Sequence, residues 1–202
     1  MTFAFASAGA FVATPPPAGG GVLREEILLL VSCGGEMNRL RDISSDVIRR
    51  LDHVLRFDLA TKYNLNQWDY RLDPSRDEPV GHVPDRSLRQ VDESEGVIAI
   101  LGRSVPEVTR LEIRRVFELR QLGQARELWV FVRSPSRGAT PVPAGAPTIR
   151  EFVDEVRRDF GRELIYRRSE TELDFQASLM TTLFPFLMTR VGVGHGPLGS
   201  AA

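Results

Sequence analysis

Residues 95–117, EGVIAILGRSVPEVTRLEIRRVF, decide the fold of this chain. The run 96–101 is apolar throughout rather than at alternate positions, which predicts a strand that is buried on both faces. Residues 102–104, GRS, turn the chain away, and a helix is expected from about residue 110. In α/β folds, ligands bind just beyond the carboxyl ends of the strands. Glu112 lies shortly after such an end, so it is the first candidate site residue.

Strand-like and helix-like stretches alternate five times along the chain, which predicts an α/β fold with a parallel sheet and helices on both faces. Five strands joined by right-handed crossovers predict a three-layer, flavodoxin-like fold of strand order 2-1-3-4-5. The first and third strands are then neighbours. The expected strands are 27–31, 65–68, 96–101, 128–132 and 164–166, and the expected helices are 36–63, 87–92, 110–122, 148–160 and 169–188.

The chain has 202 residues, of which 42% are hydrophobic, enough for one domain with a core. We expect this domain to span residues 24–189, between disordered tails at 1–23 and 190–202, because both ends are rich in Gly, Ala and Pro. Residues 69–84 and 134–147 contain several prolines and glycines and are expected to be loops. The first of them is long enough to be functional.

Charge and composition exclude several classes of function. The formal net charge of −1 gives no general attraction to nucleic acid or to an anionic membrane. No stretch approaches the roughly 20 apolar residues of a membrane helix. The single cysteine, Cys33, rules out an intrachain disulfide and fits a cytoplasmic protein. Because the three histidines are scattered, no metal site is expected.

Two loops are expected to face each other beyond the first and third strands. They are residues 32–35, SCGG, and residues 102–104. Gly34 and Gly102 allow a ligand to approach the backbone closely, and N–H groups that follow Ser32 are suited to a phosphate. Arg39 or Arg103 is the candidate cation for a pyrophosphate, or else each is a solvated surface arginine. We therefore predict a nucleotide ligand at these loops.

Two further residues are candidates for ligand binding. Trp68 ends the second expected strand and is expected either to stack on a base or to cover the edge of the sheet. Asp92 precedes the third strand, where it either orients a ribose or caps the entry to that strand.

The local sequence of Glu112 has an ordinary explanation. Thr109-x-x-Glu112 fits a capping box, in which the threonine oxygen and the glutamate carboxylate each accept a backbone N–H. The same spacing recurs at Thr148-x-x-Glu151 and at Ser169-x-x-Glu172. What separates Glu112 from the other two is the strand that it follows. Glu112 is therefore either a helix cap or a ligand-facing carboxylate.

Four features together indicate a family resemblance. A strand that ends at Ser32 leads into a long helix, and Trp68 ends the second strand. Asp92 precedes a strand that is followed by Gly102, and Glu112 precedes a glycine and an apolar strand. In these features, residues 27 to about 187 resemble the flavodoxin-like domains of the Toll/interleukin-1 receptor (TIR)-like and nucleoside deoxyribosyltransferase-like group.

The resemblance implies an activity. Enzymes of this group cleave the bond between a base and its sugar, in NAD or in nucleosides, and their glutamate matches Glu112. It acts on the ribose as a nucleophile or stabilises the positive charge of the transition state. NAD would be a substrate rather than a cofactor, no metal would be needed, and the setting would be a signalling or defence response.

The same resemblance implies a second, non-catalytic function. Many domains of this group act as signalling or nucleotide-sensing modules by association with themselves or with a signalling partner protein. The last expected helix, 169–188, carries more apolar residues than one buried face needs, which is consistent with a homo-oligomer. A nucleoside deoxyribosyltransferase, the third interpretation, usually completes its site with residues of a neighbouring subunit.

Overall fold

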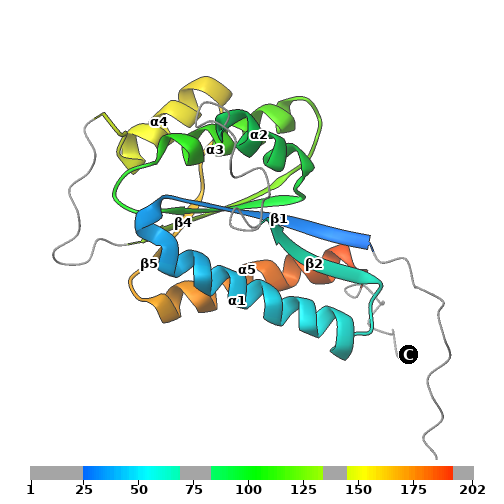
Figure 1. Ribbon diagram of the computed structural model, residues 1–202. Helices are drawn as coiled ribbons and strands as arrows, with labels where there is room; N and C mark the ends of the chain where they lie inside the picture. Colours follow the sequence, from blue (N-terminus) through cyan, green and yellow to red (C-terminus); the bar gives the residue numbers. More distant parts are fainter. Residues whose placement is uncertain (1–24, 69–82, 134–144, 193–202) are drawn as a thin grey trace, which may run out of the picture.

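The computed structural model describes residues 25–68, 83–133 and 145–192 (Figure 1). Most of both expected tails and of the two expected loops lies outside these ranges, and the predicted domain limits stay a prediction. The elements in chain order are β1 (Glu25–Cys33), η1 (Gly35–Met37), α1 (Asn38–His53), η2 (Val54–Asp58), β2 (Tyr63–Trp68), α2 (Val83–Glu93), β3 (Gly96–Leu101), α3 (Glu107–Gln121), β4 (Glu127–Arg133), α4 (Ile149–Phe160), β5 (Tyr166–Ser169) and α5 (Glu172–Arg190).

The five strands form one sheet of order β2-β1-β3-β4-β5, and every pair is parallel. This confirms the predicted flavodoxin-like order. Strand β3 is buried at every position, as its uninterrupted apolar sequence predicts. In the pairing of β1 with β3, Ser32 lies opposite Ala99 and Cys33 lies opposite Ile100. The carboxyl ends of these two strands therefore meet at one edge of the sheet.

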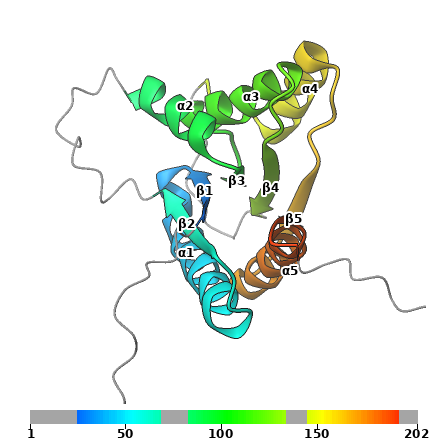
Figure 2. The same ribbon diagram turned by 90° about the vertical axis from the view of Figure 1, so that its right-hand side faces the viewer.

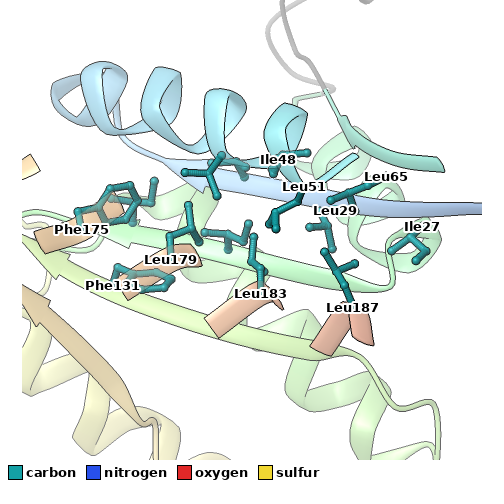
Figure 3. Packing of buried hydrophobic residues seen from close by; sticks show 14 of the residues in the cluster. Ile27, Leu29, Ile48, Leu51, Leu65, Phe131, Phe175, Leu179, Leu183 and Leu187 are labelled. Carbon is teal, nitrogen blue, oxygen red and sulfur yellow. The ribbon is translucent and has the colours of Figure 1, made fainter. Parts of the chain in front are cut away.

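Helices cover both faces of the sheet, so the domain has three layers. Helices α2, α3 and α4 lie on one face, and α1 and α5 lie on the other, as Figures 1 and 2 show. The largest buried cluster lies between the sheet and helices α1 and α5. Helix α5 contributes Phe175, Leu179, Leu183 and Leu187 to it (Figure 3). Their spacing of four residues places them on one stripe of the helix.

Alternation along β1 decides which side chains face which layer. Leu29 and Val31 belong to the cluster on the side of α1 and α5, whereas Leu30 packs with residues of α2 and α3. Successive side chains of a strand point to opposite faces, so Ser32 shares the face of Leu30. This alternation directs the serine hydroxyl toward α3.

Several predicted limits are wrong. Helix α2 begins at Val83, four residues before the predicted start, and two further elements differ as follows. The helix predicted over 36–63 is shorter in the structure, where α1 ends at His53 and the π-helical turn η2 follows it. The left-handed backbone of Ala60 (φ 47°) then redirects the chain. The last strand was predicted at 164–166, but β5 begins at Tyr166. Leu164 is buried before strand pairing starts, and Ile165 is 79% exposed, so these apolar residues mark the approach to the strand.

Across the described ranges, no helix has both the length and the apolar character needed to cross a membrane.

Candidate functional site

Three buried polar side chains meet between β1 and α3. Ser32, Thr109 and Glu112 are each at most 2% exposed. The Ser32 hydroxyl is hydrogen-bonded to the Glu112 carboxylate and lies 3.0 Å from the Thr109 hydroxyl. We call these three residues the Ser32–Thr109–Glu112 cluster. It lies beside the carboxyl ends of β1 and β3, where the sequence predicted a ligand site.

The Glu112 side chain does not cap its helix. Helix α3 begins at Glu107 with Pro106 as the N-cap, and no side chain caps it. Proline starts a helix well because its φ is already near the helical value and it needs no N–H partner. Thr109 and Glu112 therefore lie inside the helix, and the capping box predicted there is wrong.

The other two predicted boxes provide a direct comparison. Thr148 and Glu151 form the predicted box at the start of α4. At α5 the box is formed by Thr171 and Asp174, two residues later than predicted, because β5 extends to Ser169. Of the three acidic residues singled out by this spacing, Glu112 alone is buried against the sheet.

The Ser32 hydroxyl is the donor to two acceptors, the Glu112 carboxylate and the Thr109 hydroxyl. Because a hydroxyl carries one proton, it donates to one of them at a time. A carboxylate oxygen is the stronger acceptor, so the bond to Glu112 is favoured and directs the carboxylate toward β1. Such bonds are needed because burying a charged group is costly unless it is bonded.

The structure brings the two predicted loops together. A Cβ placed on Gly34 would come within 2.9 Å of the Pro106 ring, so the loop after β1 touches the start of α3. A Cβ placed on Gly102 would collide with the Glu36 carboxylate. Side chains of this chain thus approach both glycines closely, whereas the predicted approach of a ligand to them stays a prediction. Ser104 and Val105 also bond to residues just before α4, which fixes the second loop.

Sequence reasoning missed Glu36 as a site residue. This exposed glutamate lies on η1, directly after the two glycines of the first loop, and its carboxylate reaches Gly102. The available signal was its position, since any residue right after the first loop has to face the loop after β3. Arg103 is exposed at the same edge of the sheet.

Cys33 shares this edge without having the properties of a nucleophile. Burial raises the pKa of its thiol, and although nearby Arg41 lowers that pKa, the effect of burial is larger. The thiolate, rather than the thiol, is the nucleophile.

Trp68 lies on the same face of the sheet as Ser32. It pairs with Leu30, two positions before Ser32, and packs against the apolar cluster of α2 and α3. Its indole Nε1 is buried and has no hydrogen-bond partner among the described residues. Trp68 is thus a half-buried aromatic ring on the face of the sheet that carries the Ser32–Thr109–Glu112 cluster.

Asp92 is not brought to the cluster. Its carboxylate pairs with Arg115, with Nε–Oδ1 at 2.7 Å and Nη2–Oδ2 at 3.1 Å, and raises the pKa of that arginine. Arg126 donates to the Asp92 carbonyl at 2.8 Å. Asp92 precedes β3, so it lies by the amino ends of the strands, opposite Glu112. In this position it joins α2 to α3.

Comparisons with known proteins bear on the fold. No protein-family model matches the chain, and no curated protein matches it either. Among solved structures, the TIR domain heterodimer of RPS4 and RRS1 is similar, with a TM-score of 0.45 and 11% identity over 80% of this chain and 97% of the other. The flavodoxin-like fold of the chain follows from its own strand order.

A second similar structure is the CMP N-glycosidase BcmB of Clostridium botulinum. Its TM-score is 0.38 and its identity 9%, over 75% of this chain and 97% of the other. The fold itself is established by the strand order and by the parallel registers described above.

Proposed function

We propose that this domain cleaves the N-glycosidic bond of NAD or of a related nucleotide, with Glu112 as the reactive carboxylate. One observation carries the proposal. Glu112 is 1% exposed, is bonded to Ser32 across two elements, and does not cap its helix. Burying a carboxylate against a sheet is costly, and groups placed in this way are candidates for function.

The chemistry needs a fixed negative charge beside the sugar. As the bond between C1′ and the base nitrogen breaks, its electrons leave with the base and positive charge grows on the ribose ring. A carboxylate held beside C1′ stabilises that charge, or bonds to C1′ until water replaces it. The hydrogen bond from Ser32 keeps the carboxylate in one orientation, so that little reorganisation is needed during the reaction.

NAD is the preferred substrate class for a simple chemical reason. The nicotinamide of NAD⁺ already carries a positive charge on the bonded nitrogen, so it leaves as a neutral molecule without being protonated. The Ser32–Thr109–Glu112 cluster supplies one carboxylate and no imidazole. One carboxylate suffices for this leaving group, whereas a neutral base generally needs an acid as well.

The surrounding residues supply the other contacts in this proposal. The N–H groups near Gly34 receive the phosphates, with Arg103 as their cation. Trp68 stacks on a base, and Glu36 accepts hydrogen bonds from ribose hydroxyls. Asp92 supports α3 through Arg115 rather than touching the nucleotide.

The test is nicotinamide release from NAD by the purified chain, assayed over a wide range of protein concentrations. Glu112→Gln keeps the shape of the side chain and removes the charge, and the expected rate falls at least 100-fold. Glu151→Gln is the matched control, because it changes an acid that only caps a helix. No release by the wild type at any concentration, or equal rates in both variants, would reject the proposal.

The alternative is a non-catalytic module that acts by self-association. Leu173 and Phe184 on α5 are 73% and 42% exposed, which favours it. Light scattering of the wild type and of a Leu173→Ser, Phe184→Ser double variant distinguishes the two functions. A monomer at all concentrations would exclude the alternative and leave the glycosidase activity to be judged by the assay above.

A further inference from the structure

A cavity lies at the end of α3 that is far from the Ser32–Thr109–Glu112 cluster, between the ends of α3 and α4, which lie side by side on the sheet (Figure 2). Its volume is about 380 Å³, within the range of small-molecule sites. Helix α3 starts at the carboxyl ends of the strands and returns toward their amino ends. Arg120, which lines the cavity, is therefore about 12 Å along the helix axis from Glu112. The lining residues are Phe117, Arg120, Gln121, Gly123, Ala125, Phe160 and Arg162.

Two aromatic rings form the apolar part of this cavity. Phe117 and Phe160 are stacked, with ring centres 5.3 Å apart. The Arg120 guanidinium lies 5.7 Å from the centre of the Phe117 ring. A planar ligand that enters here meets aromatic carbon on one side and a cation at the rim, an arrangement that favours an aromatic group next to a negative charge.

The two arginines of the cavity come from different elements. Arg120 is in the last turn of α3, and Arg162 follows α4. Neither forms an ion pair with any described residue, in contrast to Arg114 of the same helix, which pairs with Glu155 and Asp159. Of the Arg120 nitrogens, Nε donates to the Arg126 carbonyl at 2.9 Å. This bond leaves the outer edge of the guanidinium for a ligand.

The charged groups around Arg120 leave an excess of positive charge, which a bound anion would neutralise. Burial lowers the pKa of Arg120, the Glu127 carboxylate raises it, and the positive charge of Arg162 lowers it. Two cations thus act on each other at one cavity, and Glu127 is the acidic group that offsets them. A bound anion would pair with both guanidinium groups.

The helix dipoles alone do not explain this arrangement. Cations at the ends of α3 and α4 do stabilise the negative helix termini. However, the carbonyls of Glu118, Leu119 and Arg120 are already bonded to backbone N–H groups of the turn that follows α3. In addition, the interaction of a cation with a helix dipole does not account for an open cavity with an aromatic wall.

We propose that this cavity binds a small aromatic anion, a carboxylate or phosphate on a planar ring, between Arg120 and Arg162 and against Phe117 and Phe160. The planar ring lies along the two phenyl groups, and the anionic group bridges the two guanidinium groups. The site is separate from the Ser32–Thr109–Glu112 cluster, so it does not depend on the proposed glycosidase activity.

The test is isothermal titration calorimetry of the full chain with three probes of one shape. They are 2-naphthoate, 2-naphthyl phosphate and the neutral 2-naphthamide. We expect at least one anion to bind with a Kd below 1 mM, at least 10-fold more tightly than the amide, and the tighter anion identifies the headgroup. Arg120→Gln and Arg162→Gln should each weaken that binding at least 10-fold.

The matched control is Arg157→Gln, since Arg157 lies on α4 near the cavity but pairs with Glu163 on the exposed surface. Its affinity for the anion should stay within 2-fold of the wild type. Thermal melting of every variant verifies folding, and weaker binding in both folded arginine variants supports the proposal, whereas an effect in only one of them would overturn the bridging arrangement. Equal affinity for the amide, equal affinity in all variants, or no binding of either anion would overturn the proposal.

Discussion

Ser32 on β1 donates a hydrogen bond to Glu112 on α3, although the two residues are 80 positions apart in the chain. The bond joins the first strand to the helix that follows the third, which is possible because β1 and β3 are neighbours. Glu112 is not a helix cap because α3 begins five residues earlier, at Glu107. The carboxylate therefore points toward the sheet and not toward the first turn of its own helix.

The first prediction concerns the stability that this bond provides. Ser32→Ala removes the donor and leaves a buried carboxylate with one hydrogen bond fewer, which should lower the free energy of unfolding by about 1–3 kcal/mol. Ser44→Ala is the control, because Ser44 is equally buried but donates within α1, to the Leu40 carbonyl at 2.9 Å. The control should change the free energy by less than about 1 kcal/mol.

Urea unfolding of four proteins measures the coupling directly. They are the wild type, Ser32→Ala, Glu112→Gln and the double variant. We expect an interaction energy of at least about 0.5 kcal/mol, since the two side chains are in contact. Strictly additive effects would show that Ser32 does not support Glu112.

The second prediction is a loss of stability in acid. The pKa of Asp159 is lowered mainly by its bond with Arg114, and the pKa values of Glu151 and Asp174 are lowered by their capping bonds. A lowered pKa in the folded state stabilises the fold at every pH above the unfolded value, about 4. That stabilisation is lost as the pH falls through the folded values.

Thermal melting between pH 7 and pH 3 measures this loss. The midpoint should be nearly constant down to about pH 5 and fall steeply below about pH 4. Asp159→Asn should melt lower at pH 7 and show a shallower fall in acid, because it lacks one of the titrating groups. A profile parallel to that of the wild type would contradict the role given to Asp159.

The strand order was predictable because the three central strands β1, β3 and β4 contain short apolar runs and strand-like stretches alternate with helical patterns. The run 96–101 matches β3 at both ends, since a fully buried strand has an unbroken apolar sequence. The edge strand β5 was misplaced because it carries Arg167 and Arg168, exposed residues that leave little apolar signal. Partly buried edges are where such patterns are weakest.

The candidate site was predictable in part, for a related reason. The glycines of the two loops and the position of Glu112 follow from topology, so their meeting was expected. The bond with Ser32 depends on where α3 starts, and both Pro106 and Thr109 are good starting residues. In the structure α3 starts after Pro106, which lies against Gly34 of the loop after β1, a tertiary contact that the sequence pattern does not reveal.

The third prediction concerns close packing at the start of β3. A Cβ on Gly96 would lie 2.6 Å from the ring of Trp129 on β4, so Gly96→Ala forces the ring or the strand to move. We expect a loss of about 1–3 kcal/mol in the free energy of unfolding. Gly35→Ala, where no atom lies within 4 Å of the added Cβ, should stay within about 0.5 kcal/mol of the wild type. Similar losses in both variants would contradict the packing argument.

The fourth prediction concerns the ionic contact between α3 and α4. Glu155 on α4 is 8% exposed and accepts hydrogen bonds from Arg110, with the shortest at 3.0 Å, and from Arg114. Glu155→Gln leaves two half-buried guanidinium groups without this charge, although Glu107 and Asp159 still pair with them. Breaking a fully buried pair costs about 3–5 kcal/mol, so we expect a smaller loss here, about 2 kcal/mol.

Glu163→Gln is the control for this measurement, since its pair with Arg157 is exposed to solvent. Such pairs contribute at most about 1 kcal/mol. Urea unfolding in low and high salt separates the two cases, because salt screens the exposed pair far more than the buried one. If Glu155→Gln cost no more than Glu163→Gln, the α3–α4 contact would rest on the remaining Arg114–Asp159 pair and on apolar packing such as that of Phe117 against Phe160.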